Sequence, residues 1–245
     1  MNTPSPSTRV SELVRDNPGR TRIFEQFGID YCCSGSRTLA DACAARRVSP
    51  DDVVTALREF DAGVDLDVAD WNSAPLGQLI DHIVEAHHEY LREELPRIEG
   101  LFQKLISSHG GKYPEILSCA DVFVDLRYEL ECHIMQEEQA LFPAIRRMEG
   151  QKPGDFIGQR TVGIGEPVSV METEHMRTGR ALEEMRKLLH GYEPPQSACA
   201  THRALLEALA RLERDLHEHI SKENNILFPR ALEIGDGAFE GWPAD

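Results

Sequence analysis

A stretch that occurs twice decides the fold of this chain. Residues 130–143 read LECHIMQEEQALFP, and residues 216–229 read LHEHISKENNILFP. Each copy has a histidine, a glutamate four residues later and then Leu-Phe-Pro: His133 and Glu137 in the first, His219 and Glu223 in the second. Residues four apart in a helix lie on one face, one turn above each other. Each copy therefore predicts an imidazole and a carboxylate that can reach the same point in space.

Another histidine precedes each copy at nearly the same distance. His88 lies 45 residues before His133, and His175 lies 44 residues before His219. A single His-x3-Glu pair is most often a weakly stabilising surface pair. Its duplication in one Leu-Phe-Pro context, each time after a matching histidine, indicates instead two helix pairs that build a site for two metal ions.

Two further histidines lie close to His88. His82 is six residues earlier and off its face, which predicts a supporting or solvent-exposed role. His87 is adjacent and could compete with His88, but alignment of the repeat with His175 favours His88.

The residue types of the predicted site indicate which metals it suits. The site offers four imidazoles, two carboxylates and no thiolate. Structural zinc sites are four-coordinate and rich in cysteine, so these residues disfavour them. Imidazole and carboxylate together suit iron, manganese or zinc, and a carboxylate can bridge a metal pair. We expect a dinuclear centre with an open position for a small molecule.

Helical periodicity runs through most of the chain and predicts an all-α protein. Long helices are expected at about 75–108, 114–148, 166–190 and 196–232, as an up-down-up-down four-helix bundle over residues 74–235. Residues 1–60 are predicted to form a small helical domain, and residues 61–73 an acidic linker.

Composition excludes several classes of protein. The formal net charge of the 245 residues is −16, with 26 Lys and Arg against 42 Asp and Glu. That balance argues against nucleic acid or an anionic membrane surface as the main partner. No segment approaches the roughly 18 consecutive apolar residues of a membrane span. The N-terminus has no apolar signal-peptide core, so we expect a short disordered tail on a cytoplasmic protein.

The six cysteines show no framework spacing, so reduced thiols are expected. Cys32 and Cys33 are adjacent within a turn, Tyr31–Gly35. A disulfide between neighbours is strained, which disfavours a structural bridge. The pair is then either two thiols packed in a small core or a thiolate site for redox exchange or for iron in transit, and we favour the second.

Four stretches resemble the "repair of iron centres" family of di-iron proteins. They are DYCC at residues 30–33, APL at 74–76 with LIDHI at 79–83, METEH at 171–175 and HISKENNILFP at 219–229. The resemblance covers nearly the whole chain. It implies a small domain with vicinal cysteines and a hemerythrin-like bundle. It also implies a non-haem di-iron centre bridged by Glu137, Glu223 and an oxo or hydroxo group. The ligands implied are His88, His133, Glu137, His175, His219 and Glu223. Ser34 departs from the family, which often has glycine after the cysteine pair.

The resemblance also implies the function. We expect a stress-response protein that repairs iron–sulfur clusters damaged by nitrosative or oxidative stress, by donating iron to the damaged proteins. The alternatives are an enzyme that reduces nitric oxide at the ferrous pair, and a hemerythrin-like carrier or sensor of oxygen or nitric oxide. No nucleophile or acid–base pair independent of the metal stands out, so we assign no catalytic residue. The small domain could mediate a homodimer.

Overall fold

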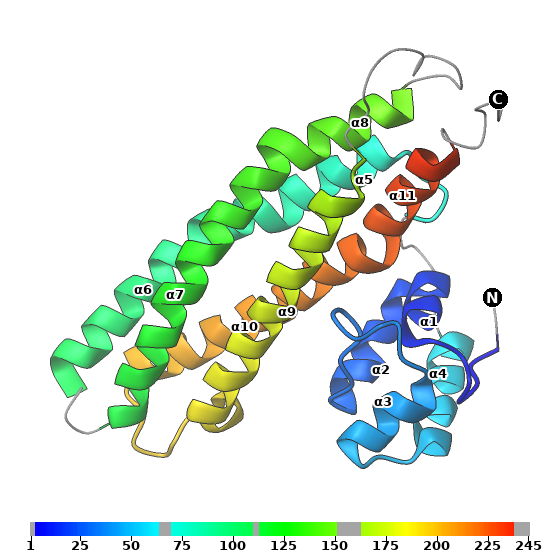
Figure 1. Cartoon of the computed structure of the whole chain (residues 1–245). Coiled ribbons are helices and arrows are strands. Elements are labelled where there is room, and N and C mark those ends of the chain that lie inside the picture. Colours follow the sequence, from blue (N-terminus) through cyan, green and yellow to red (C-terminus); the bar gives the residue numbers. More distant parts are fainter. Residues whose placement is uncertain (1–2, 64–69, 110–112, 151–162, 238–245) are drawn as a thin grey trace. The chain divides into compact units, whose positions relative to one another are not determined.

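The computed structural model describes residues 3–63, 70–109, 113–150 and 163–237. All the named secondary-structure elements in these ranges are helices, which confirms the all-α prediction (Figure 1). The chain divides into two compact units: Met1–Leu79 with His217–Asp245, and Ile80–Leu216. Within the described ranges, no helix is long and apolar enough to cross a membrane.

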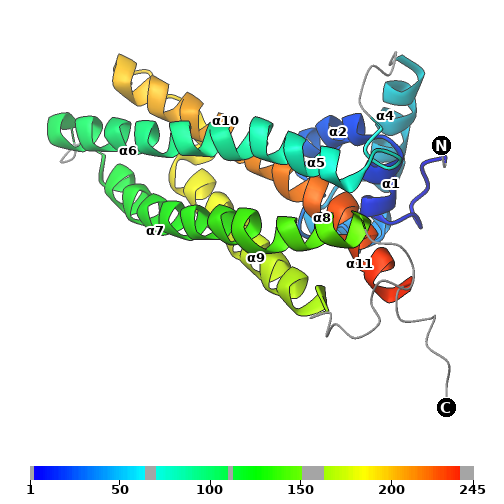
Figure 2. The ribbon, with the colours of Figure 1, turned by 90° about the horizontal axis from the view of Figure 1, so that it is seen from above.

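The unit Ile80–Leu216 is built on four long helices. They are α6 (Glu89–His109), α7 (Pro114–Gln136), α9 (Gly165–Leu188) and, as far as Leu216, α10 (Ala200–Lys222). In Figures 1 and 2 these helices run alongside one another. The structure confirms the four-helix bundle, preceded in the chain by a small helical region.

Apolar residues three or four positions apart give each bundle helix one buried stripe. In α10 the stripe is Leu205, Leu209, Leu212 and Leu216, all essentially inaccessible to solvent. The stripes pack into one core; the further members on α6, α7 and α9 are Leu91, Leu95, Ile98, Phe102, Leu105, Ile116, Cys119, Phe123, Leu126, Leu130, Ile134, Leu182 and Met185. The rings of Phe102 and Phe123 join α6 to α7 with centroids 5.3 Å apart. This apolar core gives the unit its rigidity.

Three of the long helices continue through a π-helical turn. α5 (Leu76–Ile83) passes through η2 (Val84–His88) into α6. α7 passes through η3 (Glu137–Leu141) into α8 (Phe142–Gly150), and α10 passes through η5 (Glu223–Leu227) into α11 (Phe228–Gly237). The predicted helix ranges agree with these bounds except for the fourth helix, which begins at Ala200, after the 3-10 turn η4 (His190–Tyr192), and ends at Gly237 rather than at about residue 232. Pro194 and Pro195 disfavour helical backbone before it.

The N-terminal region consists of short helices with clear sequence signals at their ends. They are α1 (Val10–Asp16), the 3-10 turn η1 (Pro18–Arg20), α2 (Thr21–Gln26), α3 (Leu39–Arg46) and α4 (Pro50–Gly63). Asn17 caps η1 by accepting the Gly19 N–H at 3.0 Å. Gly28 follows α2 with φ +64°, a conformation that favours glycine. The small core comprises Val10, Leu13, Val14, Ile23, Phe24, Ile29, Tyr31, Cys32, Leu39, Ala42, Cys43, Val53, Val54, Leu57 and Ile220.

The prediction of a disordered tail is wrong for the described residues before α1. The N–H of Leu39 donates to the Thr8 carbonyl at 2.9 Å, and the N–H of Ala40 donates to the Pro6 carbonyl at 2.9 Å. Pro4 is buried. The segment is ordered because it satisfies the first free N–H groups of α3.

The fully buried guanidinium of Arg20 pairs with a carboxylate at the end of α4. Arg20 donates to Asp61 at 2.7 and 3.0 Å and to the Leu13 carbonyl at 3.0 Å, and Asn17 donates to Asp61 at 3.0 Å. Asp61 lies in the part of α4 that extends beyond the predicted domain end at residue 60; the helix ends three residues after that boundary, at Gly63. The boundaries 1–60, 61–73 and 74–235 stay a prediction, and residues 64–69 of the linker lie outside the described ranges.

We predict that Asp61→Ala destabilises the small domain by about 3 kcal/mol, because removing one partner leaves a buried charge uncompensated. The measurement is hydrogen–deuterium exchange of α1–α4 together with urea unfolding. Glu59→Ala, an exposed position on the same helix, is the control and should leave both unchanged. Equal stability of the two variants would contradict a structural role for the Arg20–Asp61 pair.

Candidate metal centre

The predicted glutamates stand at the first residue of two π-helical turns. Glu137 begins η3 and Glu223 begins η5, and in both turns the closing hydrogen bond spans five residues, from the Phe142 N–H to the Glu137 carbonyl and from the Phe228 N–H to the Glu223 carbonyl. A proline follows each phenylalanine. Proline lacks an N–H, and its ring collides with the carbonyl four residues earlier in a regular α-helix. The repeated Phe-Pro therefore favours a wider turn beside each ligand, as π turns often do at functional sites.

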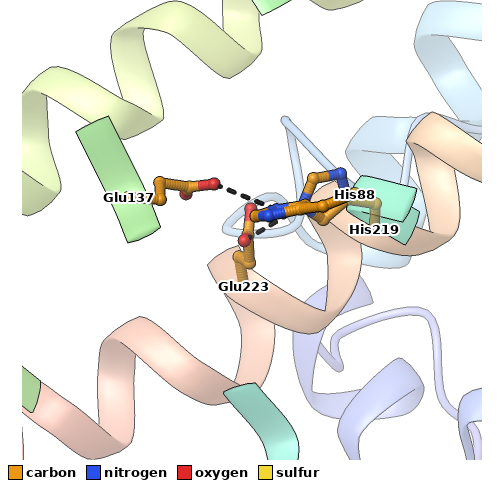
Figure 3. Close-up of side chains that lie close together, drawn as sticks. All are labelled: His88, Glu137, His219 and Glu223. Atoms are coloured by element: carbon orange, nitrogen blue, oxygen red, sulfur yellow. Dashed lines mark hydrogen bonds and ion pairs between the residues drawn. The ribbon is translucent and has the colours of Figure 1, made fainter. Parts of the chain in front are cut away.

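Four buried side chains form the first of two ligand groups. One ligand atom from each of His88, Glu137, His219 and Glu223 lies within 4.8 Å of all the others. Figure 3 shows the carboxylates of Glu137 and Glu223 pointing toward the two imidazoles. His88 Nε2 lies 3.4 Å from Glu137 Oε2, and His219 Nε2 lies 3.1 Å from Glu223 Oε1.

The second group shares both glutamates with the first. His133, Glu137, His175 and Glu223 also place one ligand atom each within 4.8 Å of the others. His133 Nε2 lies 3.4 Å from Glu137 Oε1 and 3.1 Å from His175 Nε2. The two oxygens of Glu137 thus face different histidines, one in each group. This arrangement is compatible with the predicted role of Glu137 as a carboxylate between two metal positions.

Carboxylates behind the histidines fix the direction in which the imidazoles point. Glu138 lies 2.7 Å from His88 Nδ1, and Glu174 lies 2.7 Å from His133 Nδ1. A neutral imidazole that donates from Nδ1 keeps its Nε2 lone pair for a metal, and such carboxylate–histidine pairs accompany most metal-binding histidines. The Nε2 atoms of His88 and His133 are therefore the predicted donor atoms.

The two supporting carboxylates stay ionised for different reasons. Burial acts to raise the pKa of Glu138, but hydrogen bonds from Arg92 and His88 bring it below its ordinary value. For Glu174, the hydrogen bond from His133 lowers the pKa and outweighs the effect of burial. Both groups therefore remain acceptors for Nδ1–H at neutral pH.

The donor set fits metal ions. Glu137 and Glu223 are both 0% exposed, and each faces imidazole nitrogen. Burying two negative charges side by side is costly, and neutral imidazoles do not compensate them. A divalent or trivalent cation in each group would compensate them, and nitrogen and oxygen ligands without thiolate suit iron or manganese.

Comparison with known proteins agrees with this geometry. Residues 79–231 match the family described as "Hemerythrin HHE cation binding domain", and residues 6–61 match a "Domain of Unknown function (DUF542)". Relatives named iron-sulfur cluster repair protein YtfE are 38% identical in Edwardsiella ictaluri and 37% identical in Escherichia coli O81. Each match covers 223 residues, 91% of this chain and 96% of the relative. The chain belongs to this family of iron–sulfur cluster repair proteins.

Membership of the repair family confirms the predicted resemblance and the hemerythrin-like fold. All six predicted ligands fall inside the matched cation-binding region and within the two groups of side chains. The region and its His/Glu cluster fit non-haem iron. That these six residues bind the metal stays a prediction, which metal analysis of variants can test.

The neighbouring histidines have separate contacts. His87 Nδ1 lies 2.8 Å from Asp215, so His87 does not belong to either ligand group. The His82 ring packs edge-on against His87 with centroids 5.9 Å apart. The repeat alignment therefore selected the histidine that joins the cluster, His88, over its adjacent competitor.

Sequence analysis missed the carboxylates that orient the histidines. Glu138 directly follows Glu137, and Glu174 directly precedes His175. A carboxylate next to a predicted ligand was the available signal, because metal-binding histidines usually donate to one.

The predicted thiol pair lies in a turn organised by Asp30. Its carboxylate accepts the N–H groups of Cys32 at 3.1 Å and Cys33 at 2.9 Å, and Cys32 Sγ lies 3.5 Å from both Asp30 Oδ1 and Cys33 Sγ. The hydrogen bond with Cys33, burial and nearby negative charge raise the pKa of Cys32 well above its ordinary value. Cys32 is thus a thiol at neutral pH, and a metal must displace its proton. All six cysteines are unbridged, as expected.

We predict that Glu174→Ala weakens metal binding about 10- to 100-fold, because His133 loses the acceptor that fixes its tautomer and direction. Iron titration of the metal-free protein, followed by absorption and by competition with a chelator, measures the affinity. Glu172→Ala is the matched control, an exposed glutamate two residues away on α9. Equal affinities in the two variants would show that Glu174 does not support a ligand.

Proposed function

We propose that this protein repairs damaged iron–sulfur clusters by donating iron from a dinuclear non-haem centre. The proposed ligands are His88, His133, Glu137, His175, His219 and Glu223, with Glu137 and Glu223 as bridges. The observation that carries the proposal is the position of the Glu137 carboxylate between two histidines. Its two oxygens each lie 3.4 Å from a nitrogen of a different histidine, His88 or His133. The relatives named as iron–sulfur cluster repair proteins support the repair function.

The ligand set suits iron that has to be released again. Carboxylates and imidazoles bind a metal only when deprotonated, so a proton that reaches either bridging glutamate weakens the hold on both positions. Reduction to the ferrous state lowers the metal's charge and acts in the same direction. Because both irons would share the two glutamates, a change at one iron affects the other. Protonation or reduction can then release one iron easily.

A surface pocket brings solvent close to one of the supporting carboxylates. The pocket has a volume of about 360 Å³, and Arg92, Met135 and Glu138 are among its lining residues. Arg92 holds both oxygens of Glu138 at 2.7 Å, and Glu138 in turn accepts from His88. The pocket therefore offers water and protons a short path to the outer side of the His88 imidazole.

The vicinal cysteines are the proposed intermediate acceptor. One donor atom from each of Asp30, Cys32 and Cys33 lies within 4.8 Å of the other two. Thiolate binds iron well, and displacing the Cys32 proton couples uptake to proton release. Redox exchange between the thiols is the alternative role for the same pair.

The proposed partners follow from the proposed chemistry. They are proteins with damaged iron–sulfur clusters, with nitric oxide or oxygen as small ligands of the open position. A homodimer and a cytoplasmic location stay predictions.

We predict that the purified protein holds two irons per chain with an oxo-bridged absorption, and that Glu137→Ala and Glu223→Ala each lose the absorption and at least one iron. Each variant removes a carboxylate shared by both ligand groups. Elemental analysis and absorption spectroscopy of anaerobically prepared protein are the measurements.

The control is Glu129→Ala, an exposed glutamate on α7 that should retain both irons. Zinc, or no bound metal, in the unmodified protein would overturn the di-iron proposal and iron donation with it.

We predict that the iron-loaded protein transfers iron stoichiometrically to an apo-ferredoxin supplied with sulfide, because the ligands release iron on protonation or reduction. Cluster absorption of the recipient and residual iron of the donor are the measurements. Free ferrous iron at the same concentration, with a chelator present in both reactions, is the control.

Other outcomes would select another function. Repeated turnover of nitric oxide with a reductant and without iron loss would favour the reductase. Reversible oxygen binding with neither activity would favour the hemerythrin-like carrier.

A further inference from the structure

Two consecutive asparagines of η5 bond the turn that carries the cysteine pair. Asn224 Nδ2 donates to the Cys32 carbonyl at 2.9 Å, and Asn225 Nδ2 donates to the Tyr31 carbonyl at 3.1 Å. Asn225 is only 4% exposed and also donates to Ser221 Oγ at 2.9 Å, which fixes the direction of its amide. An amide NH2 is a donor that a backbone carbonyl can accept, so the contact depends on this side-chain type.

The cysteine turn is closely packed against the same helical segment. A Cβ added to Gly35 would lie 2.8 Å from Asn225 Oδ1 and 3.0 Å from Ser11 Cβ, so a larger residue there would have to displace a neighbouring side chain. Ile220, one turn before Glu223, belongs to the buried core of the N-terminal helices. The two hydrogen bonds therefore form within a packed interface, where water does not easily replace them.

The same π turn presents the proposed bridging ligand. Glu223 is the first residue of η5 and Asn224 the second. A change in the backbone of this turn when Glu223 gains or loses a metal must therefore displace the amides that hold the Cys32–Cys33 turn. The bonds from Asn224 and Asn225 go to backbone carbonyls of the cysteine turn, so through these bonds the two residues act on the position of the turn.

We propose that Asn224 and Asn225 are positioning residues that couple occupancy of the metal centre to the order of the Cys32–Cys33 turn. In this arrangement the thiols are held in place while Glu223 is anchored by metal, and the turn loosens when the metal leaves. The inference rests on the proposed function for the direction of transfer, but the coupling itself is a property of the fold.

Hydrogen–deuterium exchange of the full-length protein tests the coupling. The observable is exchange of residues 31–35, measured with the protein metal-free and loaded with ferrous iron. In the unmodified protein we expect slower exchange on loading. In the loaded protein, Asn224→Ala should speed exchange about fivefold, which corresponds to losing one hydrogen bond of about 1 kcal/mol. In Asn224→Ala/Asn225→Ala, the difference between loaded and metal-free protein should disappear.

Asn72→Ala is the matched control, because Asn72 makes the same kind of bond elsewhere in this unit, from Nδ2 to the Arg15 carbonyl at 2.6 Å. It should leave exchange of residues 31–35 and its response to iron unchanged. Asn224 is only partly buried, so its variant should fold even if the variant of buried Asn225 does not. Circular dichroism and iron content, both expected to be unchanged in Asn224→Ala, check this.

The coupling and the repair function fail in different ways. The same response to iron in the unmodified protein and in Asn224→Ala, or no response in either, would overturn the coupling. A full response without iron delivery to an apo-ferredoxin would overturn donation and leave the coupling intact. If both proposals hold, Asn224→Ala delivers iron several-fold more slowly from a normally loaded centre.

Discussion

The burial of two carboxylates is the constraint on which the rest of this structure depends. Glu137 and Glu223 are both inaccessible to solvent, and no apolar packing can offset the cost of burying two like charges together. Stability has to come from the leucine-rich stripes further along the bundle, and the charge has to be compensated by a cation. A cation bound between these carboxylates would therefore stabilise the folded chain, because it would compensate the charge that folding buries.

The repeated Leu-Phe-Pro explains how one local pattern builds both halves of the centre. In each copy the glutamate opens a π turn and the proline stands two residues after that turn ends. The wider turn lets a long helix continue past the proline without the collision that a regular α-helix would suffer. The irregular part of each helix thus begins at a proposed ligand, so a change in the shape of its backbone would move that side chain.

Sequence patterns predicted what is local or repeated, and missed what depends on tertiary contact. The spacing of apolar residues gave the helix ranges, and the internal repeat selected His88 rather than His87. The π turns were not predicted from sequence. Over a single turn, the spacing of apolar residues does not distinguish a backbone hydrogen bond between residues five apart from one between residues four apart. The Arg20–Asp61 pair and the bond from His133 to Glu174 escaped because each joins positions about 40 residues apart, which only the folded chain brings together.

The two copies of the repeat differ most informatively at the residue after the glutamate. In the first copy this residue is Glu138, an acceptor that orients His88 at 2.7 Å. In the second copy it is Asn224, a donor that bonds the Cys32 carbonyl at 2.9 Å. An ionised glutamate has no proton to donate to a carbonyl, so glutamate at position 224 could not make the second contact. The repeat keeps its proposed ligands identical and varies the neighbouring position, so that Glu138 bonds a proposed ligand and Asn224 bonds the turn that carries the thiols.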